Sequence, residues 1–118
     1  MTSVVSMAVA ILIRVESNGD WGAVGDGGRS VGLTQISPAI VADCNRIYPQ
    51  YEFTLRDRYD PFLNIEMATI WLSREASRRR IADPRKLCYR WNAPKTGSPS
   101  KSYIRKIQKE YDRICPRQ

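Results

Sequence analysis

The apolar residues near the start of the chain form one long block. Residues 4–13 contain a single polar side chain, Ser6. A block of this length, with apolar residues on nearly every side, predicts a helix that is buried over most of its surface. We expect this helix to cover residues 4–16, with Thr2 or Ser3 as its cap, and to be the central helix of the domain.

The pattern changes directly after this block. Six glycines lie within residues 19–32, too many for a helix. They predict a tight turn or a small β-hairpin over residues 19–36, where another segment can approach the backbone closely. Within this segment we expect Leu33 and Ile36 to point inward and Trp21 to cover apolar surface.

Three later pairs of residues have the signature of a helix start, a capping side chain followed by a proline in the first turn. These pairs are Ser37-Pro38, Asp60-Pro61 and Asp83-Pro84. We expect the helices that follow them to cover about residues 38–47, 61–79 and 84–91. In the second of these, apolar residues recur at helical spacing.

Two further stretches are expected to be loops, and one more helix follows. Residues 49–59 are polar, aromatic and irregular, and residues 92–99 are rich in Pro, Gly and Ser. After them, Ser100 or Ser102 opens a last helix. Its apolar face is expected to carry Ile104, Ile107, Tyr111 and Ile114. With no internal repeat and no dividing linker, residues 1–118 predict one mainly α domain of about five to six helices.

The chain carries a formal net charge of +7, from 19 basic and 12 acidic residues. This excess favours an anionic partner through long-range attraction. Bacterial cell wall, nucleic acid and acidic membrane all qualify, and charge alone does not choose among them. The apolar block is too short to span a bilayer, which needs roughly 20 residues. It also lacks the basic flank and the cleavage site of a signal peptide, so we expect neither.

The chain contains no histidine, and this excludes several classes of enzyme. Ser-His-Asp and Cys-His hydrolases, His-ligated zinc and His general bases are ruled out. Cys44, Cys88 and Cys115 are too few and too scattered for a thiolate metal site, and we favour free thiols while one disulfide stays open. Carboxylates are left as the main acid–base groups. Glycoside cleavage is the large enzyme class that needs nothing else, so we expect no metal and no cofactor.

Glu16 is the candidate acid because it follows the apolar block, near the end of the expected central helix. Burial disfavours an ionised carboxylate and raises its pKa. A glutamic acid in such a place can donate a proton near neutral pH. A lone glutamate at a helix end is more often an ordinary surface residue, so the choice depends on the motifs around it.

Several fragments, in their order and spacing, carry a resemblance to a known family. They are Glu16-Ser17, Gly32-Leu33-Thr34-Gln35-Ile36, Asp60-Pro61 with Asn64-Ile65, Tyr89-Arg90-Trp91-Asn92-Ala93-Pro94, and Ser102-Tyr103-Ile104. Over about residues 8–108 they resemble the signatures of the soluble lytic transglycosylase and goose-type lysozyme superfamily. Thr34 stands in place of the usual Met, and Trp91 in place of the usual Tyr.

The resemblance implies a lysozyme-like α+β domain with the small hairpin beside a cleft. It implies cleavage of the β-1,4 bond between N-acetylmuramic acid and N-acetylglucosamine in peptidoglycan, with Glu16 as general acid and then base. The expected partners are peptidoglycan glycan strands and, in addition, other anionic wall polymers. The expected setting is the bacterial cell wall, where a periplasmic, secreted or phage-delivered monomer would act.

Asp26 is the candidate second catalytic residue, and its role would distinguish hydrolysis from transglycosylation. In goose-type lysozymes an Asp before the Gly-Leu-Met-Gln motif places a water for inverting hydrolysis, and Asp26 has a similar spacing. In lytic transglycosylases the acetamido group and the C6 hydroxyl of the substrate complete the reaction without a second carboxylate. Ser37 replaces the other goose-type Asp, which argues against hydrolysis. Because residues 25–28 are also an ordinary turn sequence, both reactions and the turn interpretation stay open.

The resemblance also implies substrate-binding residues, namely Ser17, Gln35, Tyr89, Trp91, Asn92 and Tyr103. Gln35 suits an acetamido or hydroxyl group of a sugar, or ties the hairpin to the first helix. Ser17 orients Glu16 or caps backbone groups. The fragment 89–92 is implied to form the other wall of the cleft, with aromatic faces against sugar rings. Tyr103 resembles a cleft tyrosine that reaches toward the catalytic Glu, or simply packs on a helix face.

A helical nucleic-acid-binding module is the alternative from another class, because the chain is basic and contains short helices and aromatic residues. Such a module needs a recognition helix with clustered Arg, Lys, Asn and Gln on one face. The densest basic run, residues 78–80, instead closes a helix and leads into Asp83-Pro84. We therefore expect no nucleic-acid partner.

Overall fold

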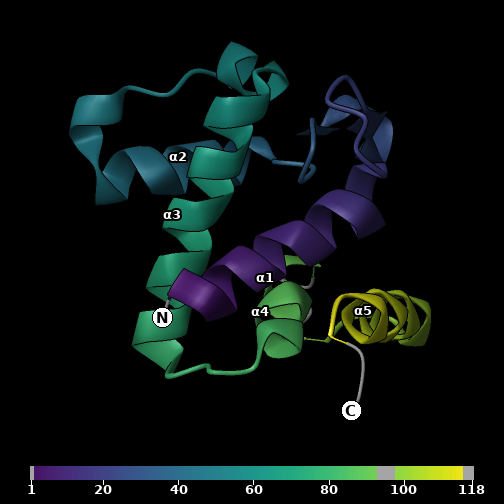
Figure 1. Ribbon diagram of the computed structural model, residues 1–118. Coiled ribbons are helices and arrows are strands. Elements are labelled where there is room, and N and C mark those ends of the chain that lie inside the picture. Colours follow the sequence, from purple (N-terminus) through teal and green to yellow (C-terminus); the bar gives the residue numbers. More distant parts are fainter. Residues whose placement is uncertain (1, 93–97, 116–118) are drawn as a thin grey trace.

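The computed structural model of the chain describes residues 2–92 and 98–115. Within them lie five α-helices and one two-stranded antiparallel sheet (Figure 1). The helices are α1 (Thr2–Leu12), α2 (Pro38–Ile47), α3 (Pro61–Arg79), α4 (Pro84–Asn92) and α5 (Lys101–Ile114). The mainly helical, lysozyme-like α+β fold that the sequence predicts is confirmed.

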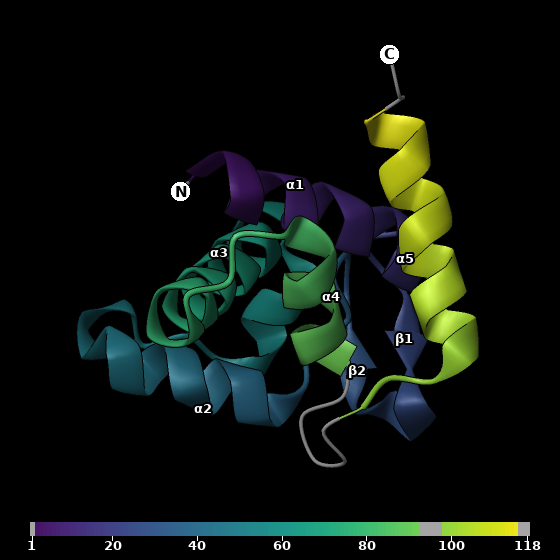
Figure 2. The same ribbon diagram turned by 90° about the horizontal axis from the view of Figure 1, so that it is seen from below.

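Helix α1 runs through the middle of the molecule. Helices α3 and α4 pack against it, and α5 lies beside its C-terminal end (Figures 1 and 2). Val5, Ala8, Ile11 and Leu12 of α1 are buried in the core that these helices share. The apolar block is therefore the central helix, as predicted, although its α-helical part ends at Leu12 and not at residue 16.

The residues that follow, Ile13–Ser17, form a π-helical turn. A π turn is wider than an α turn and often occurs at functional sites. Asn18 then ends the helix in the left-handed conformation, with a φ of 52°. Hydrophobic spacing cannot reveal one widened turn, because a single turn is too short to show its own period. Glu16 lies in this turn.

Four of the five predicted helix starts have their capping side chains in place, whereas α1 already includes Thr2 and Ser3, which we expected to precede it as its cap. Each side-chain oxygen accepts a hydrogen bond from a backbone N–H of the first turn: Ser37 from Ile40, Asp60 from Phe62 and Leu63, Asp83 from Arg85, and Ser100 from Tyr103. A cap of this kind stabilises a helix by about 1 kcal/mol. Residues 49–59, which we expected to be a loop, contain two short 3-10 helices, Pro49–Tyr51 and Leu55–Tyr59.

The glycine-rich segment forms the predicted hairpin. Strand β1 (Val24–Gly25) pairs with strand β2 (Ser30–Val31) in antiparallel register. Leu33 and Ile36 are buried as expected, but Trp21 is 59% exposed, so the expectation that it covers apolar surface is wrong. Strands of two residues cannot hold a hairpin together, and this hairpin needs support from the rest of the domain.

Asn64 of α3 supplies that support. Its Nδ2 donates to the carbonyl oxygens of Val31 (3.1 Å) and Arg58 (2.8 Å), while its Oδ1 accepts from the backbone N–H (3.0 Å) and the hydroxyl (2.6 Å) of Thr34. The side chain is fully buried. Gly32 has a φ of 87°, and a side chain there would overlap both Arg58 and Asn64. Only glycine fits this close approach.

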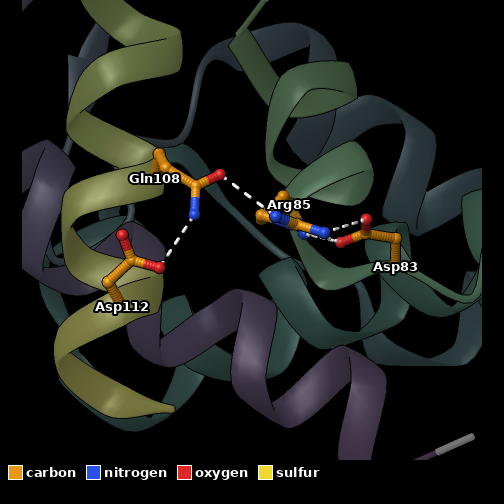
Figure 3. A network of polar contacts seen from close by, with 4 residues as sticks. All are labelled: Asp83, Arg85, Gln108 and Asp112. Atoms are coloured by element: carbon orange, nitrogen blue, oxygen red, sulfur yellow. Dashed lines mark hydrogen bonds and ion pairs between the residues drawn. The ribbon is translucent and has the colours of Figure 1, made fainter. Parts of the chain in front are cut away.

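A network of polar side chains joins α4 to α5 (Figure 3). Arg85 forms an ion pair with Asp83 (2.8 Å) and donates to the amide oxygen of Gln108 on α5 (3.1 Å). Its guanidinium lies 4.5 Å from the ring centre of Tyr111. Gln108 in turn donates to Asp112 at 2.9 Å. These contacts hold α5 in one orientation against α4.

The buried face of α5 differs from the predicted one at one position. Ile107 is buried, and Tyr111 and Ile114 are half-buried, as expected. Ile104, however, is 36% exposed, and Tyr103 is buried in its place. Neighbouring residues on a helix point about 100° apart, so turning Tyr103 toward the core moves Ile104 to the edge of the face.

The three cysteines are free thiols, as favoured from the sequence. Cys44 and Cys88 are buried, and Cys115 is partly exposed. Burial raises the pKa of Cys44 to about 12 and also raises the pKa of Cys88, so both thiols are neutral. Among the helices of residues 2–92 and 98–115, none is long and apolar enough to cross a bilayer.

We expect Asn64→Ala to lower the free energy of unfolding by at least about 3 kcal/mol, because each buried group left without a partner costs about 1–3 kcal/mol and a cavity adds to the loss. Chemical denaturation followed by circular dichroism measures the change. Thr69→Ala on the same helix is the control, since its exposed hydroxyl bonds only to the Ile65 carbonyl. Its cost should stay below about 0.5 kcal/mol. Equal losses in both variants would contradict the role given to Asn64.

Candidate active site

Glu16 is partly buried in the π-helical turn after α1. Its Oε2 accepts a hydrogen bond from the hydroxyl of Tyr103 on α5, at 2.6 Å. Its Oε1 has no hydrogen-bond partner within the described residues. The fold thus places a tyrosine from the last helix against a glutamate from the first, and one carboxyl oxygen is left for another contact.

Four effects act on the pKa of Glu16, and together they raise it. Burial is the largest of them and raises the pKa, because a dry environment disfavours the charged form. The hydrogen bond from Tyr103 lowers the pKa, the negative charge of Asp26 raises it, and the positive charge of Lys106 lowers it. Since burial outweighs the two opposing effects, Glu16 keeps its proton to a higher pH than an exposed glutamate does.

Ser17 connects the π-helical turn to the hairpin. Its Oγ lies 2.7 Å from the carbonyl oxygen of Leu33 and 3.0 Å from that of Ile13. The same oxygen accepts from the N–H of Gly19 at 3.2 Å. Ser17 therefore caps backbone groups and holds the residue next to Glu16 in place, and it does not line the cleft described next.

A cleft of about 360 Å³ opens beside Glu16. Four residues that the sequence singles out line it: Glu16, Asp26, Gln35 and Trp91. The remaining lining residues come from the hairpin, from α2 and its cap, and from α3; they are Arg29, Ser30, Ser37, Ala39, Ile40, Asp43 and Trp71. The acid, the hairpin and an aromatic wall therefore face one hollow.

Asp26 lies in the turn of the hairpin, with a φ of 53°. Aspartate tolerates this left-handed conformation better than most other residues with a side chain. Its Oδ2 accepts from the hydroxyl of Ser30 at 2.6 Å, which fixes the carboxylate at the edge of the cleft. Asp26 is thus a turn residue and, at the same time, a charge that acts on Glu16.

Gln35 braces the hairpin from the side of the cleft. Its Nε2 donates to the carbonyl oxygens of Ala23 and Gly32, both at 3.1 Å. It therefore ties two parts of the hairpin together, whereas the link from the hairpin to the first helix is made by Ser17. Within the described residues the Oε1 of Gln35 has no hydrogen-bond partner, so an acceptor remains beside the cleft.

Two tryptophans stand side by side along the cleft. The rings of Trp91 and Trp71 meet edge to face, with their centres 5.5 Å apart. Trp91 donates through Nε1 to the carbonyl oxygen of Thr34 (2.8 Å), and Trp71 donates through Nε1 to Oδ2 of Asp43 (3.0 Å). Both indole N–H groups are therefore satisfied. Trp91 is buried, with 5% of its surface exposed, and Trp71 is half-buried, so most of the aromatic surface in the cleft belongs to Trp71.

Sequence analysis did not identify Trp71 or Asp43 as site residues. Trp71 falls in the apolar pattern of α3, where nothing separates a cleft residue from a core residue. Asp43 follows Ile40 by three positions, so both lie on one face of α2. If Ile40 is known to line the cleft, the spacing of three residues predicts that Asp43 lines it too.

Tyr89 and Asn92 differ from Trp91. Tyr89 is half-buried against the core and is not among the residues that line the cleft. It lies two positions before Trp91, and residues two apart on a helix point about 200° away from each other. The side chain of Asn92 lies outside the described residues, as do Ala93 and Pro94, so the role of Asn92 stays a prediction.

The described residues contain no group of three or more Cys, Asp or Glu side chains placed to hold a metal ion. What the cleft offers is a carboxyl with a raised pKa, a second carboxylate that influences it, a free amide oxygen and an aromatic wall. Such a set can transfer a proton to a neutral polar ligand that has apolar faces.

The chain matches the family model described as the transglycosylase SLT domain over residues 1–86. The matched range contains Glu16, Asp26 and Gln35, whereas Trp91 and Tyr103 follow it. No curated protein and no solved structure matches the chain.

We expect Tyr103→Phe to raise the pKa of Glu16 further, because the variant removes the hydrogen bond that lowers this pKa. Titration of the Glu16 side-chain carboxyl by carbon NMR measures the effect. Tyr111→Phe, on the same helix, removes a hydroxyl that does not contact Glu16 and serves as the control. A pKa that stays at its wild-type value in Tyr103→Phe would show that the hydrogen bond has no influence on the acid.

Proposed function

Because the chain belongs to the transglycosylase SLT domain family, whose members are enzymes that act on peptidoglycan, we propose that it cleaves the β-1,4 bond between N-acetylmuramic acid and N-acetylglucosamine by lytic transglycosylation. In this proposal Glu16 is the single proton-transfer residue. Peptidoglycan glycan strands are the substrate, and the bacterial cell wall is the place of action. The raised pKa of Glu16 at the cleft is the observation that carries the proposal.

The environment of Glu16 suits an acid that must donate a proton and later take one back. Burial and the charge of Asp26 favour the protonated form, in which the proton can sit on Oε1, the oxygen that has no partner among the residues the structure describes. The hydroxyl of Tyr103 donates to Oε2 and stabilises the carboxylate once the proton has left. Because burial favours the protonated form and the Tyr103 hydroxyl favours the carboxylate, Glu16 suits both steps of acid–base catalysis.

The proposed reaction has two steps. Glu16 donates its proton to the glycosidic oxygen, the C1–O bond of N-acetylmuramic acid breaks, and the N-acetylglucosamine side leaves as an alcohol. The acetamido oxygen of the substrate stabilises the positive charge at C1. The C6 hydroxyl then bonds to C1 and gives its proton to the Glu16 carboxylate, so that the enzyme is regenerated and the product has a 1,6-anhydro end.

The wall and the rim of the cleft fit a glycan strand. Trp71, which packs against the buried Trp91, presents apolar ring surface, and this suits the C–H face of a pyranose. The Oε1 of Gln35, which has no partner within residues 2–92 and 98–115, can accept a hydrogen bond from an acetamido N–H or a sugar hydroxyl. Asn92 is proposed as a further contact at the same wall, as the family resemblance implies.

We propose transglycosylation over hydrolysis because of the position of Asp26. Its Oδ2 accepts a hydrogen bond from the hydroxyl of Ser30. Asp26 itself is exposed, in the turn of the hairpin. Its clearest effect is on charge, since it raises the pKa of Glu16 and so favours the acid form. A base that activates water for hydrolysis would have to bind and orient that water as well.

Glu16→Gln should lower the rate of peptidoglycan cleavage by about 10²–10⁴-fold, the usual contribution of a general acid–base group. Release of soluble muropeptides from purified peptidoglycan measures the rate, and circular dichroism shows that the variant is folded. Glu52→Gln, an exposed carboxylate far along the chain, is the matched control and should keep wild-type activity. Substantial activity in a folded Glu16→Gln variant would rule out Glu16 as the proton donor.

The activity of the wild-type enzyme should also fall as the pH rises through the pKa of Glu16, because the first step needs the protonated acid. In Tyr103→Phe this fall should begin at a higher pH, in line with the further rise of the Glu16 pKa. A fall at the same pH in both proteins would mean that another group controls the reaction.

The products distinguish the two reactions. We expect mass spectrometry of the muropeptides to find 1,6-anhydro ends and not reducing ends. Asp26→Asn should keep these ends and change the rate by less than about tenfold, since it removes only a charge effect. Reducing ends in the wild-type digest, together with a loss of more than about 100-fold in Asp26→Asn, would assign Asp26 as the base of a hydrolase.

A further inference from the structure

A second groove continues from the cleft between α2 and α3, and we call it the α2–α3 groove. It has a volume of about 360 Å³ and is lined by Asp43, Arg46, Ile47, Trp71, Arg74, Glu75 and Arg78. Asp43 and Trp71 also line the cleft. The hydrogen bond from Trp71 to Asp43 therefore forms the boundary between the two hollows. A ligand that fills the cleft can extend over this boundary into the groove.

Both carboxylates of the α2–α3 groove are already neutralised. Asp43 forms an ion pair with Arg46 and accepts from Trp71. Glu75 accepts from Arg79 (2.8 Å) and Arg90 (3.3 Å), which approach it from α3 and α4. Neither carboxylate needs a further cation, so the remaining guanidinium groups of the groove are not used for internal pairing.

Arg74 and Arg78 are those remaining groups. Within residues 2–92 and 98–115 neither has a hydrogen bond or an ion pair. They lie one turn apart on α3, at positions i and i+4, and so on the same side of the helix. Two planar guanidinium groups on one side of a groove match the geometry of a carboxylate, which arginine binds through paired N–H donors.

We propose that the α2–α3 groove binds the free carboxylates of the short peptides that peptidoglycan carries on its N-acetylmuramic acid residues, with Arg74 and Arg78 as the binding residues. The inference rests on the proposed function and names a further part of the same substrate. The peptide leaves the glycan at the sugar whose bond is cleaved, next to the cleft. From Trp71 to Arg78 the helix rises about 10 Å, a span that a short peptide covers.

The charges of the groove favour a peptide carboxylate over a polyanion. The ion pairs of Asp43 and Glu75 leave the groove with the two positive charges of Arg74 and Arg78, which suit one carboxylate better than a chain of closely spaced phosphates. A single carboxylate can bind Arg74 and Arg78 while its aliphatic neighbours pack against Ile47 and the ring of Trp71. The groove thus combines one local anion site with apolar side walls.

The experiment compares two substrates. Intact peptidoglycan carries the peptides, and the same material treated with an amidase that removes them does not. The double variant Arg74→Ala/Arg78→Ala should lose about five- to tenfold in kcat/KM on intact peptidoglycan at low salt, as expected for two partly exposed ion pairs. On the stripped glycan its kcat/KM should stay within about twofold of wild type, and high salt should reduce the difference on intact peptidoglycan.

The matched control is Arg56→Ala/Lys109→Ala, which removes the same charge from two exposed residues outside the groove. It should show no preference between the two substrates. The proposal would be overturned if the double variant Arg74→Ala/Arg78→Ala lost kcat/KM equally on both substrates. It would also be overturned if kcat/KM stayed unchanged on both. A loss that disappears when phosphate polymers, and not peptides, are stripped from the wall would overturn it in favour of a phosphate ligand.

A binding measurement separates this inference from the proposed catalysis. Co-sedimentation with intact and with stripped peptidoglycan, carried out with Glu16→Gln alone and with Glu16→Gln carrying the groove variant, does not depend on turnover. If Glu16→Gln/Arg74→Ala/Arg78→Ala binds intact peptidoglycan more weakly than Glu16→Gln does, and binds stripped peptidoglycan equally well, the peptide-binding role of the groove is supported. This holds even if the reaction proposed for Glu16 is wrong. Identical binding of both proteins to both materials would reject the groove whatever the reaction is.

Discussion

The buried amide of Asn64 is the interaction on which the rest of the site depends. The hairpin has only two paired residues on each strand, too few to be stable alone. Asn64 binds the second strand of the hairpin through Val31 and the turn after it through Thr34. The buried Arg58 adds bonds to the carbonyl oxygens of Arg29 and Ile36. Because the carbonyl of Thr34 accepts the indole N–H of Trp91, the same support extends to the aromatic wall of the cleft.

The acid depends on a second long-range contact, between the first and last helices. Glu16 lies in a widened turn that follows the most apolar helix, and burial raises its pKa. Tyr103 opposes that effect by donating a hydrogen bond to the carboxylate. The Arg85 network holds α5, the helix that carries Tyr103, against α4 (Figure 3). The chemistry of Glu16 is therefore set by helices that meet only in the folded protein. A change in the contact between α4 and α5 would move Tyr103 and so change the pKa of Glu16.

The cleft and the α2–α3 groove share a boundary of one hydrogen bond, from Trp71 to Asp43. On one side of it lie the groups that suit an uncharged sugar, and on the other side lie two arginines that have no partner in the described part of the chain. This order matches peptidoglycan, in which neutral glycan strands carry charged peptides. The excess of basic residues in the chain, which by itself indicates no particular partner, is then partly explained by where Arg74 and Arg78 lie.

The sequence by itself predicted the five α-helices, the caps of four of them, the hairpin and the family, and it favoured free thiols. Helix starts are local, because a Ser or Asp before a Pro binds backbone groups within its own turn, and family motifs are strings of neighbouring residues. Through the resemblance it also named Glu16 and Tyr103 as candidate site residues, and the structure joins them by a hydrogen bond. Only the tertiary structure decided that Glu16 lies in a π turn, that Trp71 and Asp43 join Trp91 at the cleft while Tyr89 turns away, and that α5 buries Tyr103 and exposes Ile104. The physical reason is that burial, pKa and shared hollows depend on distances between elements remote in sequence, which no local pattern contains.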